Sequence, residues 1–263
     1  MGKLQEMFTQ PLRAKSGSGI GFIGKNKPST RPRAAAVVVE FAAADSAIAE
    51  AAVKAGAEGL LFAWNGKDAA LESIKQAIAA ARSGEEKVTC GLDITSGFDA
   101  LTREIFENLK EQDVDYVILP LNAPARLLAL QVKDLELVVS VPMRKGDMYP
   151  IFIRNLTAFE GLAAVRLEFD MQHDISSLSI EDVLQYRAIR EAVRFPSMLN
   201  IESDISEADA YTLLTLGVQA LIIDAGKTSD ETKQSIQQVR ELLEQVYHEE
   251  KDSKESFGLT PSR

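Results

Sequence analysis

The chain has very little of the residue types on which many protein sites depend. Its 263 residues include one cysteine, two histidines and one tryptophan. Because Cys90 is the single cysteine, an internal disulfide and a cysteine-based metal cluster are excluded. His248 belongs to the last predicted helix, which leaves His173 as the one histidine near a site, so a two-histidine zinc centre is disfavoured.

Long hydrophobic runs are lacking as well. No stretch of about 18 residues is apolar and uncharged, and no basic start is followed by an apolar leader. We therefore expect neither a membrane-spanning helix nor a secretory signal, and a reducing cytoplasm is the expected location. The net charge of −10 argues against nucleic acid as the main partner.

What the chain does have is a repeated pattern of apolar runs, each followed by a stretch with apolar residues at helical spacing. Eight such βα units close most naturally into a (β/α)8 TIM barrel, which typically needs roughly 250 residues. We therefore predict an α/β fold with a single TIM-barrel domain over 34–250. The eight runs are AAAVVVEF from Ala34, EGLLFAW from Glu58, KVTCGLDI from Lys87, VDYVILPL from Val114, LELVVSVP from Leu135, LAAVRLEFD from Leu162, PSMLNIES from Pro196 and VQALIID from Val218.

The two ends of the chain differ from this body. Residues 1–33 are rich in Gly, Ser and Pro and hold seven basic residues against Glu6 alone, whereas the rest of the chain is strongly acidic. We predict a basic N-terminal arm over 1–33 that lies across the acidic body of its own or a neighbouring subunit, and a homo-oligomer built through this arm or through helices. Residues 251–263 are polar and are predicted to form a flexible C-terminal tail.

The arm contains a glycine pattern that resembles a nucleotide-binding loop. Gly19, Gly21 and Gly24 spell GxGxxG, and Gly19–Lys25 also fit GxxxxGK, with Asn26 where Ser or Thr is needed. Both patterns bind phosphate only where a helix starts directly after the glycines. The next residues, NKPSTRPR, cannot begin a helix promptly, so a flexible or docking arm is favoured, with a lid over the barrel as a third possibility.

Side-chain parity gives the sharpest functional prediction. Alternate side chains of a strand point to opposite sides, so Val165 and Leu167 face the surrounding helices while Arg166 and Glu168 face the barrel interior. Buried charges are costly unless they are paired, hydrated or bound to a ligand. The same reasoning on the other strands predicts a polar cluster near the barrel top that also contains Glu40, Asp93, Asn200, Glu202 and Asp224.

Two catalytic interpretations fit this cluster. In the first, Glu202 and Asp224 hold Mg²⁺ or Mn²⁺ while Arg166 grips the carboxylate or phosphate of a substrate. In the second, two carboxylates with different pKa values act as acid and base without a metal. The structural alternative is a salt-bridge network that only fills the barrel. The expected catalytic residues are Arg166, Glu168 and Asp93, and the expected substrate contacts in the cluster are Glu40 and Asn200.

The last two units resemble the closing units of phosphate-binding (β/α)8 barrels. In ISEADAYTLLTLGVQALIIDAGKTSDE, a helix ends at Gly217, a strand follows, and Gly226, Lys227 and Thr228 form the next loop. The resemblance implies that backbone amides of this loop bind a phosphate, and it allows a flavin mononucleotide (FMN) barrel that uses Gly226 and Lys227.

The chain departs from that pattern at two places. Asp224 stands where such barrels usually have glycine, and its charge would repel a phosphate. The loop over 203–206 contains no glycine. An ordinary loop, with Ser206 as the N-cap of the next helix, is the alternative.

The function that we predict is a lyase or isomerase reaction on a small anionic metabolite, carboxylated or phosphorylated, at the C-terminal mouth of the barrel. Mg²⁺ or Mn²⁺ is the candidate cofactor, and FMN is the weaker one. The alternative is a non-catalytic barrel whose charged interior is closed by ion pairs and whose arm and acidic surface serve assembly with a partner. No membrane partner is expected.

Overall fold

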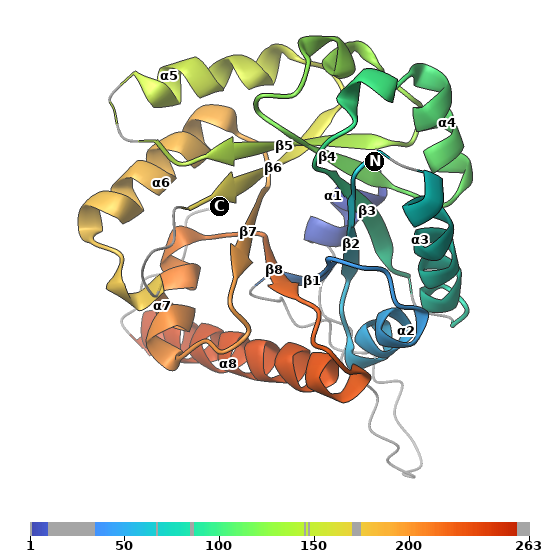
Figure 1. Ribbon diagram of the computed structural model, residues 1–263. Helices are drawn as coiled ribbons and strands as arrows, with labels where there is room; N and C mark the ends of the chain where they lie inside the picture. Colours follow the sequence, from blue (N-terminus) through green and yellow to red (C-terminus); the bar gives the residue numbers. More distant parts are fainter. Residues whose placement is uncertain are drawn as a thin grey trace, which may run out of the picture.

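The chain folds around a closed barrel of eight parallel strands that are paired in sequence order, with β8 returning to β1 (Figure 1). The computed structural model describes residues 2–9, 35–66, 68–84, 87–144, 146, 148–169 and 175–256. The predicted TIM barrel is confirmed, and each strand lies within one of the eight predicted runs. The strands are β1 (Ala36–Phe41), β2 (Gly59–Trp64), β3 (Thr89–Ile94), β4 (Tyr116–Pro120), β5 (Glu136–Pro142), β6 (Leu162–Glu168), β7 (Ser197–Ile201) and β8 (Ala220–Asp224).

Helices cover the outside of this barrel (Figure 1). The unit after β4 has a short 3-10 helix in place of an α-helix, and Pro150 stands in the first turn of α5, where proline is tolerated. In the described part of the chain, no helix is both long and apolar enough to cross a bilayer. The α-helices of the outer layer are α2 (Ser46–Ala55), α3 (Asp68–Ala81), α4 (Arg103–Glu111), α5 (Tyr149–Ile153), α6 (Ile180–Val193), α7 (Glu207–Leu216) and α8 (Ser229–Ser256), and the 3-10 helices are η1 (Phe98–Ala100), η2 (Ala125–Ala129), η3 (Arg154–Ala158) and η4 (Ile175–Ser177).

The barrel wall separates two apolar cores. Outward-facing side chains such as Val39, Leu92 and Leu167 pack against the helices, whereas Val38 packs inside the barrel. Burial of a side chain of this size contributes roughly 1.5–3 kcal/mol, so the two faces together hold the wall in place. The predicted parity of β6 is confirmed, because Leu167 faces the helices and Arg166 points inward.

Cys90 belongs to the outer core and is fully buried. Burial raises the pKa of its thiol to about 12. The thiolate is the reactive form of cysteine, so this thiol is not a nucleophile at neutral pH.

Local signals set the ends of α7. The hydroxyl of Ser206 accepts the backbone N–H of Asp209, and the carboxylate of Asp209 accepts the N–H of Ser206. The predicted N-cap is therefore confirmed. Gly217 ends the helix with a φ of 67°, a left-handed conformation that favours glycine, and the chain then enters β8.

A short helix, α1 (Lys3–Thr9), closes the N-terminal end of the barrel. Leu4 is fully buried and Met7 is 3% exposed, and both belong to the interior core. The N–H of Leu4 donates to Glu136 at the start of β5, at 2.8 Å. The prediction of a Gly- and Pro-rich arm over 1–33 did not include this helix. A seven-residue helix is unstable alone, so packing against the barrel is what stabilises it.

Most of the other residues for which terminal features were predicted lie outside the described part of the chain. Residues 10–34, which contain the GxGxxG pattern, lie outside the described residues. Helix α8 continues to Ser256, so the predicted tail over 251–263 begins inside a helix, and 257–263 lie outside the described residues.

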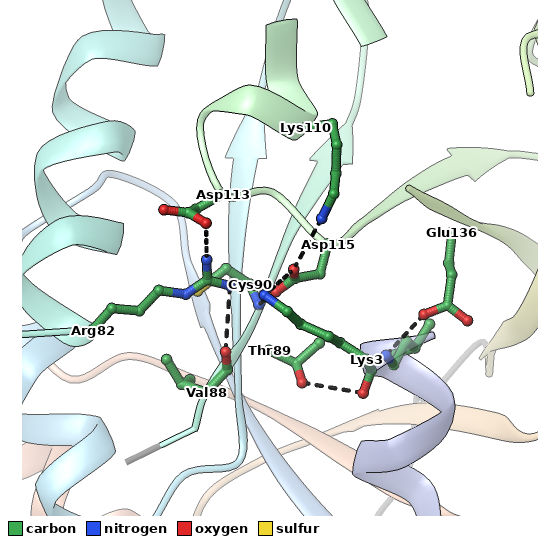
Figure 2. Close-up of polar contacts among 10 residues, drawn as sticks. Lys3, Arg82, Val88, Thr89, Cys90, Lys110, Asp113, Asp115 and Glu136 are labelled. Atoms are coloured by element: carbon green, nitrogen blue, oxygen red, sulfur yellow. Dashed lines mark hydrogen bonds and ion pairs between the residues drawn. The ribbon is translucent and has the colours of Figure 1, made fainter. Parts of the chain in front are cut away.

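Asp115, directly before β4, is the centre of a buried ionic cluster at the N-terminal end (Figure 2). Its carboxylate lies 3.0 Å from Nζ of Lys3 and accepts hydrogen bonds from Arg82 and from the N–H of Cys90, the latter at 3.0 Å. A third cation, Lys110, lies 3.7 Å away. One carboxylate therefore ties α1, the end of α3 and α4 to the barrel.

Candidate active site at the barrel mouth

Arg166 is the centre of a polar cluster at the C-terminal mouth of the barrel. Its Nη1 lies 2.7 Å from Oδ2 of Asp93 and 3.7 Å from Oε1 of Glu40. Its Nη2 lies 3.4 Å from Oε1 of Glu168, and its Nε donates to Oγ of Ser140 at 2.9 Å. Side chains from β1, β3, β5 and β6 thus meet at one guanidinium, and four of the predicted site residues lie together.

Ser140 is a member of the cluster that the sequence analysis did not predict. Its hydroxyl accepts from Arg166 and donates to the carboxylate of Glu168. Ser140 is fully buried and lies directly opposite Arg166 in the pairing of β5 with β6. Strand parity also places Ser140 inside the barrel, a signal that a search for charged residues alone passes over.

Glu40 is the carboxylate of the cluster whose pKa is shifted. Its side chain is 17% exposed, and its Oε2 accepts a hydrogen bond from Nδ2 of Asn200 at 2.7 Å. Burial raises the pKa of Glu40 above its ordinary value; Arg166 opposes the shift, and the charges of Asp93 and Asp224 add to it. A buried carboxylate with a raised pKa can exchange a proton nearer neutral pH than an ordinary one.

The cluster holds more negative than positive charge. Burial alone would lower the pKa of Arg166, but its interactions with Asp93, Glu40 and Glu168 outweigh burial and raise it, so the guanidinium stays charged. Three carboxylates still face one cation. Such an excess is costly in a buried place unless a proton, water or a ligand compensates it.

Tyr116 of β4 lies inside the barrel beneath the cluster. Its ring passes so close to Gly91 that a Cβ on Gly91 would lie 2.2 Å from Cζ of the ring. Gly91 precedes Asp93 by two residues, so it faces the same side roughly 6.6 Å further from the mouth. Tyr116 is fully buried, and its hydroxyl has no hydrogen-bond partner among the described residues.

The two residues predicted to hold a metal ion lie at the rim. Asp224 ends β8, Glu202 follows β7, and both are exposed. Within the described residues, no group of three or more His, Cys, Asp or Glu side chains is arranged to hold a metal ion. Mg²⁺ or Mn²⁺ at this pair stays a prediction, because one or two carboxylates can bind such an ion together with water and substrate oxygens. His173 lies outside the described residues.

The loop after β8, predicted to bind phosphate, uses its amides internally. The N–H of Gly226 donates to Oγ1 of Thr232 at 2.9 Å, and the N–H of Lys227 donates to Oε2 of Glu231 at 2.8 Å. The hydroxyl of Thr228 accepts the N–H of Glu231 at 3.2 Å. These contacts order the start of α8. The carboxylate of Glu231 occupies an N–H group that was predicted to donate to a phosphate. This arrangement weighs against phosphate or FMN at the loop, and binding of either ligand stays a prediction.

A cavity of about 270 Å³ lies at the opposite end of the barrel from the cluster, between α1, α7, β8 and α8. No carboxylate or basic side chain of the described chain lines it. The cavity is therefore separate from the chemistry-bearing groups. Its lining residues include Phe8, Leu213, Val218, Leu221, Leu243 and Tyr247.

Comparisons with known proteins identify the fold. No protein-family model and no curated protein matches the chain in sequence. The chain is similar in structure to the YdjI aldolase from Escherichia coli, with a TM-score of 0.52, 15% identity, and coverage of 81% of this chain and 91% of that one. It is also similar to a putative fructose-1,6-biphosphate aldolase from Coccidioides immitis, with a TM-score of 0.55, 13% identity, and coverage of 81% and 91%.

A variant of the tryptophan synthase alpha-subunit from Pyrococcus furiosus is similar as well, with a TM-score of 0.58, 13% identity, and coverage of 80% of this chain and 98% of that one. At these identities the likeness shows a shared TIM-barrel fold, and a shared fold does not carry an activity with it.

Proposed function

We propose that the chain is an enzyme of the lyase or isomerase type that acts on a small carboxylated or phosphorylated metabolite at the C-terminal mouth of its barrel. The observation that carries the proposal is the polar cluster in which Asp93, Glu40, Glu168 and Ser140 surround the buried Arg166. It occupies the end of the barrel at which enzymes of this fold have their active sites. Two of the similar solved structures are described as aldolases, which supports the lyase class.

Arg166 is the group that binds the anion. Asp93 at 2.7 Å and Ser140 at 2.9 Å hold the guanidinium in place. Glu168 is the partner that a ligand can replace, because its side chain is 45% exposed and its contact, at 3.4 Å, is long. A substrate carboxylate that takes the place of Glu168 would receive the two-pronged contact that guanidinium groups favour.

Glu40 is the group that moves a proton. Asp93 and Glu168 are the carboxylates that the sequence predicts for this role, but burial raises the pKa of Glu40 and poises it for acid–base work. In a carbon–carbon cleavage of the aldol type, Glu40 would take the proton of a substrate hydroxyl. The bond to the neighbouring carbon then breaks, its electron pair forms the enolate of the second fragment, and Arg166 faces the negative charge.

A second candidate is a non-catalytic barrel. The observation that favours it is that Nε, Nη1 and Nη2 of Arg166 all have partners within the chain. A network that is satisfied in this way can serve as filling. In that case apolar replacements of similar volume at the cluster would leave stability unchanged or raise it.

The test is thermal unfolding of the full chain with a panel of small hydroxy acids, keto acids and phosphorylated metabolites, followed by NMR detection of product from any metabolite that stabilises the protein. A ligand that binds only the native state raises the melting temperature by mass action. We expect Glu40→Gln to keep the stabilisation and lose turnover by about 100-fold or more, the usual contribution of a general base. We expect Arg166→Met to lose the stabilisation itself.

Lys227→Met is the matched control, because it removes an exposed cation from the same rim. If Lys227→Met abolishes binding while Arg166→Met does not, the anion binds at the loop after β8 and the proposed site is wrong. If no metabolite stabilises the protein and apolar replacement of the cluster does, the non-catalytic interpretation holds.

A further inference from the structure

Asp224, the last residue of β8, lies beside Glu40 at the barrel mouth. Ala220 and Ile222 belong to the interior core, and Asp224 has the same parity, so its side chain is on the interior face of the strand. The pairing of β1 with β8 places Glu40 directly opposite Asp224. Residues paired in this way belong to strands about 4.8 Å apart. Two carboxylates from neighbouring strands therefore stand side by side.

Asn200 of β7 adds an amide group to this pair. Strands β7, β8 and β1 follow one another around the barrel (Figure 1), and Nδ2 of Asn200 donates to Oε2 of Glu40 at 2.7 Å, so the hydrogen bond spans β8. Because the amide nitrogen binds Glu40, the oxygen Oδ1 is left as an acceptor, and among the described residues it has no hydrogen-bond partner. Neighbouring strands thus carry oxygen acceptors at this side of the mouth.

The charge of the two carboxylates is only partly compensated. Nη1 of Arg166 lies 3.7 Å from Oε1 of Glu40, whereas Asp224 forms no ion pair among the described residues. The charge of Asp224 also contributes to the raised pKa of Glu40, so the two carboxylates repel one another. A positively charged group between them would relieve this repulsion.

Other charged side chains around the mouth do not supply that positive group. Arg126, after β4, donates to two backbone carbonyls of the unit after β3, and Arg144, after β5, lies over the ring of Tyr149. Lys227, after β8, is exposed and forms no ion pair among the described residues. Glu202, exposed after β7, adds a further negative charge. This side of the mouth therefore keeps a surplus of negative charge.

The distances indicate how the charges of a complementary ligand are spaced. In the proposed function Arg166 binds the anionic group of the substrate, and Glu40 lies 3.7 Å from the same guanidinium. A positive group between Glu40 and Asp224 would therefore lie close to that anionic group. An α-amino acid has this arrangement, because its ammonium and carboxylate groups are attached to the same carbon. A phosphate would bring a higher negative charge to a place that already has too much, and would be repelled.

Building on the proposed function, we propose that the substrate is a zwitterion, an α-amino acid whose carboxylate binds Arg166 and whose ammonium group lies between Glu40 and Asp224. An ammonium group donates through each of its N–H bonds, which suits the two carboxylates and the amide oxygen of Asn200. Its positive charge compensates the surplus of negative charge at the mouth. The substrate class is narrower than a carboxylated or phosphorylated metabolite, because both charges are needed.

The experiment is isothermal titration calorimetry of the full chain with matched pairs of ligands. Each pair is an α-amino acid and the 2-hydroxy acid with the same side chain: alanine and lactate, serine and glycerate, aspartate and malate, and phenylalanine and phenyllactate. We expect an amino acid to bind about 10-fold or more tightly than its hydroxy acid, because hydrogen bonds to charged groups contribute on this scale. γ-Aminobutyrate, which carries the same charges further apart, should bind more weakly than that amino acid.

Asp224→Asn tests where the ammonium group binds. The residue is exposed, so the variant should fold, and it should weaken binding of the amino acid by about 10-fold while leaving the affinity for the hydroxy acid unchanged. Asp230→Asn is the matched control, because it removes a carboxylate that is 94% exposed and pairs with Lys233 at the start of α8. The control should change neither affinity. Arg166→Met should abolish binding of both ligands.

Failure of the zwitterion and failure of the proposed function give different results. If a hydroxy acid binds as tightly as its amino acid and Arg166→Met abolishes both, the anion site stands and the zwitterion is wrong. The zwitterion is also wrong if only phosphorylated metabolites bind, or if Asp224→Asn weakens binding no more than Asp230→Asn does. Binding of Mg²⁺ alone that Asp224→Asn abolishes would identify a metal ion as the cation and overturn the proposal. If no metabolite of any class binds, the proposed function fails and the zwitterion fails with it.

Discussion

At the N-terminal end of the barrel one carboxylate, Asp115, is surrounded by three cations, whereas at the C-terminal mouth one cation, Arg166, faces three carboxylates. The excess cations cost little, because Lys3 and Lys110 reach solvent with long side chains that are 53% and 26% exposed. At the mouth, the side chains of Asp93 and Glu40 are only 10% and 17% exposed while that of Glu168 is 45% exposed, and burial raises the pKa of Glu40. The first arrangement stabilises the fold, and the second costs stability, as functional sites often do.

The largest effect is expected from breaking the N-terminal cluster with Asp115→Asn. The substitution leaves the cations around a buried site without their anion, which costs about 3–5 kcal/mol when one partner of a buried pair is removed. Urea unfolding measures the loss. Asp113→Asn is the control, because Asp113 pairs with the same Arg82 but is 68% exposed, and it should cost about 0–1 kcal/mol. Equal costs would mean that burial does not distinguish the two carboxylates.

A smaller effect is expected from Gly91→Ala, in the interior between the two clusters. The new methyl group would lie 2.2 Å from the ring of Tyr116, so the ring or the strand must move. Overpacking of this kind costs about 1–3 kcal/mol. The double variant Gly91→Ala with Tyr116→Leu should recover much of the loss in the same unfolding experiment. Failure of the smaller residue to restore stability would show that the strain lies in the backbone.

The pH dependence of unfolding in Glu40→Gln tests whether the cluster at the mouth destabilises the fold. Because the pKa of Glu40 is raised in the folded state, the folded chain holds this proton more tightly than the unfolded chain. The contribution of this group to wild-type stability is therefore greatest below its ordinary pKa and falls as pH rises from that pKa through the folded one. The amide that replaces the carboxyl group does not titrate, so the stability of the variant should rise relative to that of the wild type over the same interval, which begins near about pH 4. Parallel stability curves would contradict the raised pKa.

The smallest effect is expected from Tyr116→Phe. The hydroxyl that it removes is buried and has no partner among the described residues, so its loss should change stability by only about 0–1 kcal/mol, in the stabilising direction. Thermal unfolding measures this difference. A loss of more than that would show that the hydroxyl pairs with water or another group in solution.

The sequence predicts the barrel well because its strand signal is local. Each of the eight runs contains a strand, and parity alone places Arg166 and Glu168 on the interior side of β6. Parity does not tell which interior residues touch, since Asp93 lies 73 positions before Arg166 and meets it only when the barrel closes. The pairing at the mouth therefore needed the structure.

Other features were out of reach for different reasons. The cluster at Asp115 joins residues from Lys3 to Lys110, and a single aspartate before a strand gives no local sign of such a role. In the loop after β8, Gly226 and Lys227 are compatible both with a phosphate site and with a helix start capped by Glu231. The sequence alone does not show whether these backbone amides donate to a phosphate or to the carboxylate of Glu231.

The way in which α1 closes the barrel also imposes an order on folding. Leu4 bonds to Glu136, which lies 132 positions further along the chain. At a synthesis rate of roughly 5–20 residues per second, α1 leaves the ribosome on the order of ten seconds before the strand that receives it. Leu4 and Met7 have no barrel to enter during that time. The helix is made before every strand, yet it can take its place only after β5, so the N-terminal end of the barrel closes late.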